Sequence, residues 1–397
     1  MLRFALFASV LALAATPAAA QVQVVQLAAP DAFSTPGRDT GLPAELWAGT
    51  PIETARIVLP MLAARPLSPA AANLARRILA TGAKGPDGSA SDEALAGQRA
   101  SALIALGDVA AATRLMERAP GLERNAELAR AAAETALLAG DSARACGIAD
   151  GLGTNRGDIY WLRLRAFCQA EAGQGAQAQL TFDLAQAQAR DAIYGRLMMA
   201  KLSGAAPGVA SARNGLDLAL SRSLDLDLAA AKPAPVVAAA LSGAEPATPA
   251  FDTSLIDAEI GGLGAAVRDG MPPEAGVSAL ISAAAEAAEP KPRARLQAAA
   301  LLLAALANDL PGPDRAKIAG FAVAEGKAPS GRNAALDAAS DTRRMGEAAL
   351  LALWTCADAG AAGPALGDRV RIVRSLGRAG LLDDARLFVL EGLAGLK

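Results

Sequence analysis

Few residues of this chain could carry chemistry, and one residue type that usually does so is absent. The 397 residues include no histidine, which excludes Ser-His-Asp and Cys-His catalytic arrangements and every metal site with an imidazole ligand. Carboxylate pairs remain, such as Glu286 and Glu289, three positions apart on an expected helix. No aromatic cluster that could bind sugar rings accompanies them, so we interpret them as exposed helix charge. The sequence predicts no catalytic residue, no metal site and no cofactor.

Cysteines offer a second kind of chemistry. Cys146 falls on the second helix of one predicted hairpin, and Cys168 falls on the first helix of the next. Because these helices pack together in stacked hairpins, we predict a structural disulfide between the two cysteines; two buried free thiols are the alternative. Cys356 is left over. We expect it to be buried in a core, and an intermolecular bridge is the alternative.

The first twenty residues predict the compartment. Residues 1–20 combine Arg3, an apolar stretch over 4–15 and a small-residue site at 18–20, as in a secretory signal peptide. We expect cleavage before Gln21, with an uncleaved anchor as the alternative. No later apolar run approaches the ~18 residues of a membrane span. The sequence therefore predicts an exported protein in the periplasm of a Gram-negative bacterium, without a transmembrane span after cleavage.

Composition predicts an all-α protein. Aromatic residues make up only 3% of the chain, and alanine, the strongest helix former, is abundant. We therefore expect helices that pack through Ala and Leu. The formal net charge of −2 provides no long-range attraction to nucleic acid or to an anionic membrane. A two-lobed α/β solute-binding protein is disfavoured, because the alternating strand–helix pattern is missing.

Glycines at a fixed spacing indicate how the helices are arranged. Gly107, Gly140 and Gly173 follow one another at intervals of 33 residues, and each is followed five positions later by an alanine. A fixed period in this range is typical of helical-hairpin repeats. A further copy near the C-terminus keeps the same offsets, at Leu376, Gly380, Ala385 and Val389. We interpret the four glycines as repeat turns.

This pattern resembles the tetratricopeptide repeat family, which also places a bulky and then a small residue further along the second helix. The matching positions are Met116, Ala149 and Phe182, then Ala119, Leu152 and Ala185. The family's Trp-Leu-Gly-Tyr signature is largely missing, and Trp161 and Leu164 match it only with a shift of one residue. The resemblance implies an α-solenoid of antiparallel hairpins that binds extended peptides or partner helices. An irregular helical bundle is the alternative.

Proline and glycine content suggests where the chain divides. We expect a flexible N-terminal arm at 21–50, a repeat domain at 51–203, a Pro/Ala-rich connection with short helices at 204–253 and a C-terminal helical-hairpin domain at 254–397. Within the last domain we predict helices near 254–268, 273–288, 292–309, 313–326, 342–359, 364–379 and 381–395.

One neighbourhood is a candidate for partner binding. Tyr160, Trp161, Arg156 and Arg163 surround the start of a repeat helix and could anchor a partner; burial of Trp161 in the core is the alternative. We expect a non-catalytic periplasmic scaffold or adaptor in a motility, secretion or cell-wall assembly. Its partner would be another envelope protein or a peptide segment. The alternative is a peptidoglycan-acting enzyme or its regulatory helical domain.

Overall fold

A computed structural model describes residues 33–396 apart from 118, 255, 272, 273, 308, 323 and 324. The predicted signal peptide at 1–20 lies outside the described residues. The described residues form nineteen α-helices and no β-strand, which confirms the all-α class. Within the same ranges, none of the helices has the length and apolar character needed to cross a membrane.

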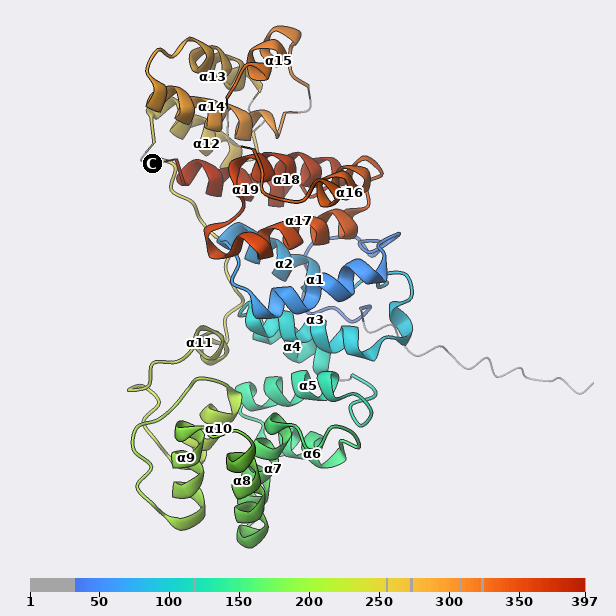
Figure 1. Cartoon of the computed structure of the whole chain (residues 1–397), viewed down its shortest axis with the longest axis vertical. Helices are drawn as coiled ribbons and strands as arrows, with labels where there is room; N and C mark the ends of the chain where they lie inside the picture. Colours follow the sequence, from blue (N-terminus) through green and yellow to red (C-terminus); the bar gives the residue numbers. More distant parts are fainter. Residues whose placement is uncertain are drawn as a thin grey trace, which may run out of the picture. The chain divides into compact units, whose positions relative to one another are not determined.

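Helices α3 to α8 follow one another as three pairs, α3–α4, α5–α6 and α7–α8, whose members pack together. The first helices of some successive pairs also pack on each other, as α1 does on α3 and α3 on α5 (Figure 1). The bounds of the first nine helices are α1 Ile52–Ala64, α2 Pro69–Ala80, α3 Glu93–Ala105, α4 Val109–Met116, α5 Ala126–Ala139, α6 Ser142–Gly151, α7 Ile159–Glu171, α8 Gly175–Gln188 and α9 Ala192–Ser203.

The glycine at a repeat turn ends one helix, and the next helix begins directly after the turn. Gly140 has φ 86°, a left-handed conformation that glycine adopts without steric cost, and it closes α5. The next residue, Asp141, accepts a hydrogen bond from the amide of Arg144 at 2.9 Å and so caps α6. Gly380 closes α18 in the same conformation, with φ 97°. The repeat alanines are fully buried, which lets paired helices approach closely: Ala112, Ala145, Ala178 and Ala385.

The remaining ten helices complete the described chain. They are α10 Gly215–Ser223, α11 Pro235–Ser242, α12 Ala258–Arg268, α13 Glu274–Glu286, α14 Pro290–Ala304, α15 Gly312–Ala319, α16 Ser330–Asp341, α17 Met345–Ala359, α18 Leu366–Ala379 and α19 Leu382–Ala394. Sequence analysis missed α16, because its Ser, Gly and Asn residues have low helix propensity. Tertiary packing compensates, since Leu336 and Ala339 of this helix are buried.

The pairing of Glu286 with Glu289 was wrong. Helix α13 ends at Glu286, and Glu289 is the residue that precedes α14. The two carboxylates therefore do not share one helix face. Pro290 at the first position of α14 explains the break, because proline starts helices readily but cannot continue one.

The prediction of a flexible arm at 21–50 was also wrong for residues 33–50; residues 21–32 lie outside the described residues. Phe33 and Trp47 are each 1% exposed and meet edge to face with ring centroids 5.7 Å apart. The guanidinium of Arg99 lies 5.0 Å from the centre of the Phe33 ring. The amide of Gly37 donates to the carbonyl of Ala80 at 2.8 Å. Proline and glycine here shape a segment that lies on the helices, and its few large side chains fix it there.

Helices from the C-terminal half pack against the first two helices. Helix α17 contacts α1 and α2, and α19 contacts α2 (Figure 1). Polar contacts accompany this packing: the amide of Ala70 donates to Glu391 at 2.9 Å, and Arg77 forms an ion pair with Asp384. The described residues from 33 onward accordingly belong to one compact unit. The repeat pattern predicts only contacts between neighbours in sequence, so it gave no sign of this long-range packing. The domain boundaries drawn at 203 and 253 stay predictions.

The predicted disulfide between Cys146 and Cys168 is present, and it joins α6 to α7 with the two Cα atoms 5.4 Å apart. The two helices also pack against each other. Cys356 of α17 is a buried free thiol. The bridge therefore covalently links two consecutive helix pairs.

We predict opposite effects for two glycine-to-alanine changes. A Cβ at Gly97 of α3 would lie 2.7 Å from the backbone nitrogen of Leu128, whereas a Cβ at Gly147 of α6 would meet nothing within 4 Å. Gly97→Ala should lower the free energy of unfolding by about 1–3 kcal/mol, because the close approach of α3 to α5 outweighs the better helix propensity. Gly147→Ala should raise it by about 0.5–1 kcal/mol. Urea unfolding measures both, and equal effects would contradict the proposed α3–α5 contact.

Removal of the disulfide should lower stability, because the bridge restricts the unfolded chain by an amount that grows with the logarithm of the loop length. The two cysteines are 22 residues apart, so the paired change Cys146→Ser and Cys168→Ser should lower the free energy of unfolding by about 3 kcal/mol. Thiol counting in denaturant should detect one thiol in each unreduced chain, that of Cys356, and three after reduction. Cys356→Ser, which leaves the bridge intact, controls for the loss of a buried thiol. Three thiols without reductant would refute the bridge.

Candidate functional site

A cavity of about 550 Å³ lies among the first helices of successive pairs. We call it the α5–α7 pocket. Its apolar wall includes Ile104 of α3, Leu216 of α10 and Val236 of α11. Its polar wall comes from α5, α7, α9 and the start of α10: Glu127, Arg130, Glu134, Tyr160, Arg163, Asp191, Tyr194, Asn214 and Asp217. Helices that follow one another along the chain therefore contribute to one binding surface.

Helix α5 supplies a row of charged side chains. Asn125 caps this helix, since its side chain accepts a hydrogen bond from the amide of Leu128 at 3.1 Å. Glu127, Arg130 and Glu134 follow at spacings of three and four residues, which places them on one helix face. The Arg130 guanidinium lies 4.9 Å from the centre of the Tyr160 ring, a cation–π contact between α5 and α7. The pocket thus has an exposed cation positioned by an aromatic ring.

Glu134 forms hydrogen bonds that link three helices. Its Oε1 accepts a hydrogen bond from the amide of Gly215 at 2.7 Å, at the first residue of α10. Its Oε2 accepts one from the Tyr160 hydroxyl at 3.3 Å. Burial raises the pKa of Glu134, and the two hydrogen bonds together with nearby Arg130 only partly oppose that rise. The carboxylate therefore joins α5, α7 and α10 at some cost in desolvation.

Tyr160 and Trp161 are adjacent in sequence but have different roles. Tyr160 lines the pocket, and burial raises the pKa of its hydroxyl well above the usual value. Trp161 is 2% exposed and meets the Tyr160 ring edge to face, with centroids 5.0 Å apart. The core interpretation is therefore correct for Trp161, whose indole supports Tyr160 from behind. Direct partner binding by Tyr160 stays a prediction.

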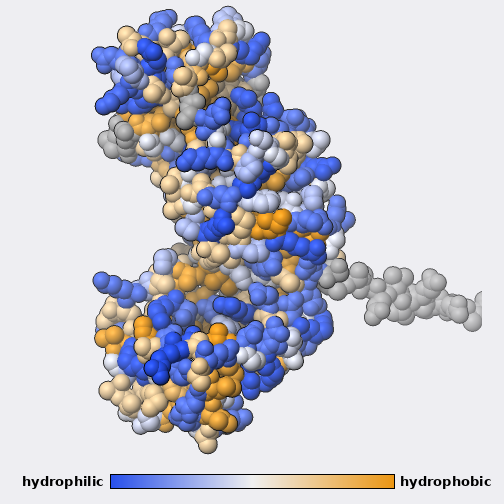
Figure 2. All heavy atoms as spheres, viewed as in Figure 1, coloured by the Kyte–Doolittle hydropathy of each residue, from blue (hydrophilic) through white to orange (hydrophobic). Residues whose placement is uncertain are grey.

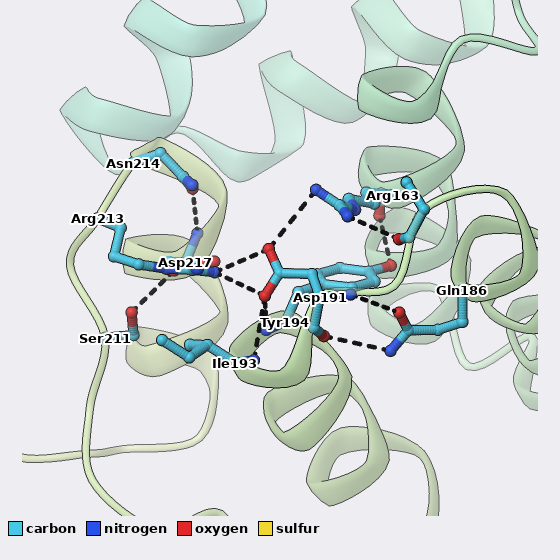
Figure 3. Close-up of polar contacts among 10 residues, drawn as sticks. Arg163, Gln186, Asp191, Ile193, Tyr194, Ser211, Arg213, Asn214 and Asp217 are labelled. Atoms are coloured by element: carbon cyan, nitrogen blue, oxygen red, sulfur yellow. Dashed lines mark hydrogen bonds and ion pairs between the residues drawn. The ribbon is translucent and has the colours of Figure 1, made fainter.

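Asp191, which lines the pocket, is the centre of a cluster of polar contacts (Figure 3). It caps α9 by accepting hydrogen bonds from the amides of Ile193 at 3.0 Å and Tyr194 at 3.1 Å. Both of its carboxylate oxygens also accept from Arg213 at 3.1 Å, and one lies 3.6 Å from Arg163. Burial by itself would raise the pKa of Asp191, but the hydrogen bond from Tyr194 and the two arginines outweigh it and lower the pKa. The site holds this carboxylate in its charged form.

Arg163 joins α7 to α9 beside this cluster. It donates to the carbonyl of Ala189 at 2.9 Å, and its guanidinium lies 5.4 Å from the centre of the Tyr194 ring. The Tyr194 hydroxyl in turn donates to the carbonyl of Arg163 at 3.1 Å. In the described part of the chain, Arg163 Nε is buried without a hydrogen-bond partner. The predicted binding residue Arg163 therefore lines the pocket but is mostly engaged in holding two helices together.

Arg156 lies away from this pocket. It donates to the carbonyls of Asp150 at 2.9 Å and Leu152 at 2.6 Å, at the end of α6. Such a contact satisfies carbonyls that have no partner within the helix. The side chain of Arg156 therefore stabilises the C-terminal end of α6. A smaller cavity of about 300 Å³ adjoins the pocket and shares Glu127, Arg130, Ile159 and Tyr160 with it.

The pocket combines several kinds of side chain. Its side chains offer hydrogen-bond donors and acceptors of both charges, an aromatic face and an apolar wall. Polar groups of both charges beside an apolar wall can orient a bound ligand. Across the residues that the structure describes, no group of three His, Cys, Asp or Glu side chains is placed to hold a metal ion.

Sequence analysis found Tyr160 and Arg163 but missed the residues that complete the pocket. Arg130 and Glu134 had a detectable signal, because charged residues three and four apart share a helix face. The sequence signal for Asp191 was weaker: it is an aspartate directly before α9, a position where aspartate commonly caps a helix. Arg213 and Asp217 had none, since α10 returns to α5 from far along the chain. Comparison of the chain with protein families, with curated proteins and with solved structures finds no match.

We predict a pH-dependent difference between the wild-type protein and the Glu134→Gln variant. Because the pKa of Glu134 is raised in the folded state, folding favours the protonated carboxyl. The free energy of unfolding that Glu134 adds relative to the variant is thus fully present below the unfolded pKa of about 4.3. This contribution is lost as the pH rises through the folded pKa of Glu134. Urea unfolding at several pH values from about 4 to 8 measures it.

The control is Glu127→Gln, which changes an exposed carboxylate on the same helix. The wild type should lose stability relative to Glu134→Gln as the pH rises, and it should show a smaller trend relative to Glu127→Gln. The same pH trend for both variants would contradict an origin in the burial of Glu134.

Proposed function

We propose that the protein is an exported, non-catalytic scaffold that binds another protein of the cell envelope through the α5–α7 pocket. The observation that carries this proposal is the pocket itself, which gathers side chains from α3, α5, α7 and α9. Repeat proteins bind extended segments in this way, with each repeat adding side chains to one continuous surface. The partner would belong to a motility, secretion or cell-wall assembly.

The arrangement of helix pairs supports an α-solenoid resembling tetratricopeptide repeats. Helices α3 to α8 form three consecutive pairs with left-handed glycines at the turns, at Gly107, Gly140 and Gly173. In such a repeat, the first helices of successive pairs form the ligand-binding face. The pocket side chains of α3, α5 and α7 come from those helices.

The disulfide supports export. Disulfides persist mainly in oxidising compartments such as the bacterial periplasm. The bridge between Cys146 and Cys168 agrees with the signal-peptide pattern of residues 1–20. We therefore place the mature protein in the periplasm.

Chemistry of the pocket favours a peptide segment as ligand. Arg130 is exposed and its guanidinium has donors available for carbonyls or carboxylates of a ligand. The adjacent Tyr160 adds an aromatic surface. Glu127 is exposed on the same face. Exposed groups of both charges beside an apolar wall can fix the direction of an extended chain.

Affinity capture from envelope extracts tests the proposal. The full chain is crosslinked to its partners in envelope extracts and recovered, and the wild type is compared with Arg130→Glu and Tyr160→Ala. Both changes should lower partner recovery by about tenfold or more, because they remove an anchor from the pocket. Arg378→Glu, a change of an exposed arginine on α18, should leave recovery unchanged.

Two results would overturn the proposal. In the first, the same partners are recovered with all variants, which would move binding to another surface. In the second, the purified chain binds or cleaves glycan strands and retains no protein partner. Circular dichroism checks that each variant keeps its helical content.

A further inference from the structure

Helix α11 is an apolar helix of which little is buried. Its eight residues, Pro235–Ser242, include no charged side chain, yet Val237 is the one among them that is buried. Leu241 is 43% exposed, and Figure 2 shows hydrophobic residues at the surface around the position of α11. The described residues on either side of the helix, 224–234 and 243–257, belong to no helix (Figure 1). We call residues 235–246 the strap.

The strap lies on the repeat helices without filling the space beneath it. Helix α11 packs against α4 and α5, and a Cβ at Gly107 of the α3–α4 turn would lie 3.5 Å from the Cβ of Ala239. A cavity of about 320 Å³ lies between the strap and the end of α3 at Ala105 and Leu106. Val236 lines both this cavity and the α5–α7 pocket. Displacement of the strap would therefore join the two spaces into one groove.

A charged contact holds the C-terminal end of the strap. Arg114 of α4 forms an ion pair with Glu245 at 3.3 Å and donates to the carbonyl of Gly37 at 2.6 Å. Nearby Arg38 pairs with Asp108. Burial lowers the pKa of Arg38, Glu245 opposes that shift and Arg114 adds to it. In the described chain Glu245 is the one carboxylate that pairs with Arg114, so this corner of the groove favours an acidic group.

The contacts of the strap are few and individually weak. The side chains of Arg114 and Glu245 are each about half exposed, and ion pairs of this kind add little stability. At the other end, Val237 supplies the one buried side chain of α11. A competing segment can therefore replace the strap while helices α3 to α5 stay packed through their own contacts.

We propose that the strap occupies the groove in place of a partner segment of the same chemistry, a short uncharged helix of small apolar residues followed by a carboxylate, and that the partner displaces it. The carboxylate of the partner pairs with Arg114, and its apolar residues take the place of Val237. The partner chain then continues into the α5–α7 pocket. This inference rests on the proposed binding function, and it adds the chemistry of the ligand and a step that controls access to the pocket.

Exchange of the strap for a synthetic peptide tests the inference. The probe is a fluorescently labelled peptide of residues 232–247, and anisotropy measures its dissociation constant with the full chain. Val237→Asp should unseat the strap and tighten peptide binding at least tenfold, because a tethered strap competes at an effective concentration in the millimolar range. Leu241→Asp, at an exposed position of the same helix, should leave binding as in the wild type. Equal binding by all three chains would overturn the inference.

A charge exchange tests the position of the carboxylate. In the chain that carries Val237→Asp, the further change Arg114→Glu should weaken peptide binding at least threefold. A peptide with Glu245→Lys should recover most of that loss, and a misfolded chain cannot produce such a recovery. Weak binding of both peptides, or no effect of Arg114→Glu, would show that Arg114 does not receive the carboxylate.

A disulfide that locks the strap separates this inference from the proposed function. Gly107→Cys with Ala239→Cys should fix the strap in place, because the two Cβ atoms lie within disulfide distance. Gly107→Cys alone carries the same backbone strain and is the control. The locked chain should recover at least fivefold less partner from envelope extracts than the control does.

The two proposals fail in different ways. If Arg130→Glu loses the partners but the locked chain keeps them, the strap does not control access, and the pocket remains the binding site. If Arg130→Glu keeps the partners, the proposed function fails, and the peptide exchange alone decides whether the strap occupies a binding groove.

Discussion

Close approach of helices through small side chains is the constraint on which this structure depends. With aromatic residues at 3% of the chain, large side chains cannot fill wide gaps between helices. Alanines at the repeat positions Ala112, Ala145 and Ala178 are fully buried, and Gly97 lets α3 touch the backbone of α5. Tight packing of this kind recovers the van der Waals contacts that bulky side chains would otherwise provide. It also leaves little room for polar groups inside each pair.

Polar groups therefore gather where successive pairs meet, and there they bind helices to one another. Glu134 joins α5 to α7 and α10, and Asp191 joins α9 to the arginines of α7 and of the segment before α10. Burial removes both carboxylates from water. Hydrogen bonds and arginines more than offset this cost for Asp191, but they offset it only partly for Glu134. The pocket is the space that these contacts leave between the helices. Its walls are held by the same bonds that stabilise the stacking.

Local features of the fold could be predicted from sequence, because they depend on a few neighbouring residues. The turn at Gly140, the cap at Asp141 and the bridge from Cys146 to Cys168 all follow from spacing along one or two helix pairs. The packing of 33–50 onto the helices could not be predicted, since its composition is that of a loop and its order comes from Phe33 and Trp47. The contact of α17 and α19 with α1 and α2 was equally hidden. Such contacts depend on how well the surfaces of distant segments fit together, and a repeat pattern describes only residues that are near each other in sequence.

The disulfide acts on the same helices that form the pocket. It ties the helix pair α7–α8 to the pair before it, α5–α6. Helix α5 supplies Arg130 and Glu134 to the pocket, and α7 supplies Tyr160 and Arg163. Because the bridge restricts the movement of α6 against α7, it adds a covalent restraint to the hydrogen bonds that already join these pairs across the pocket.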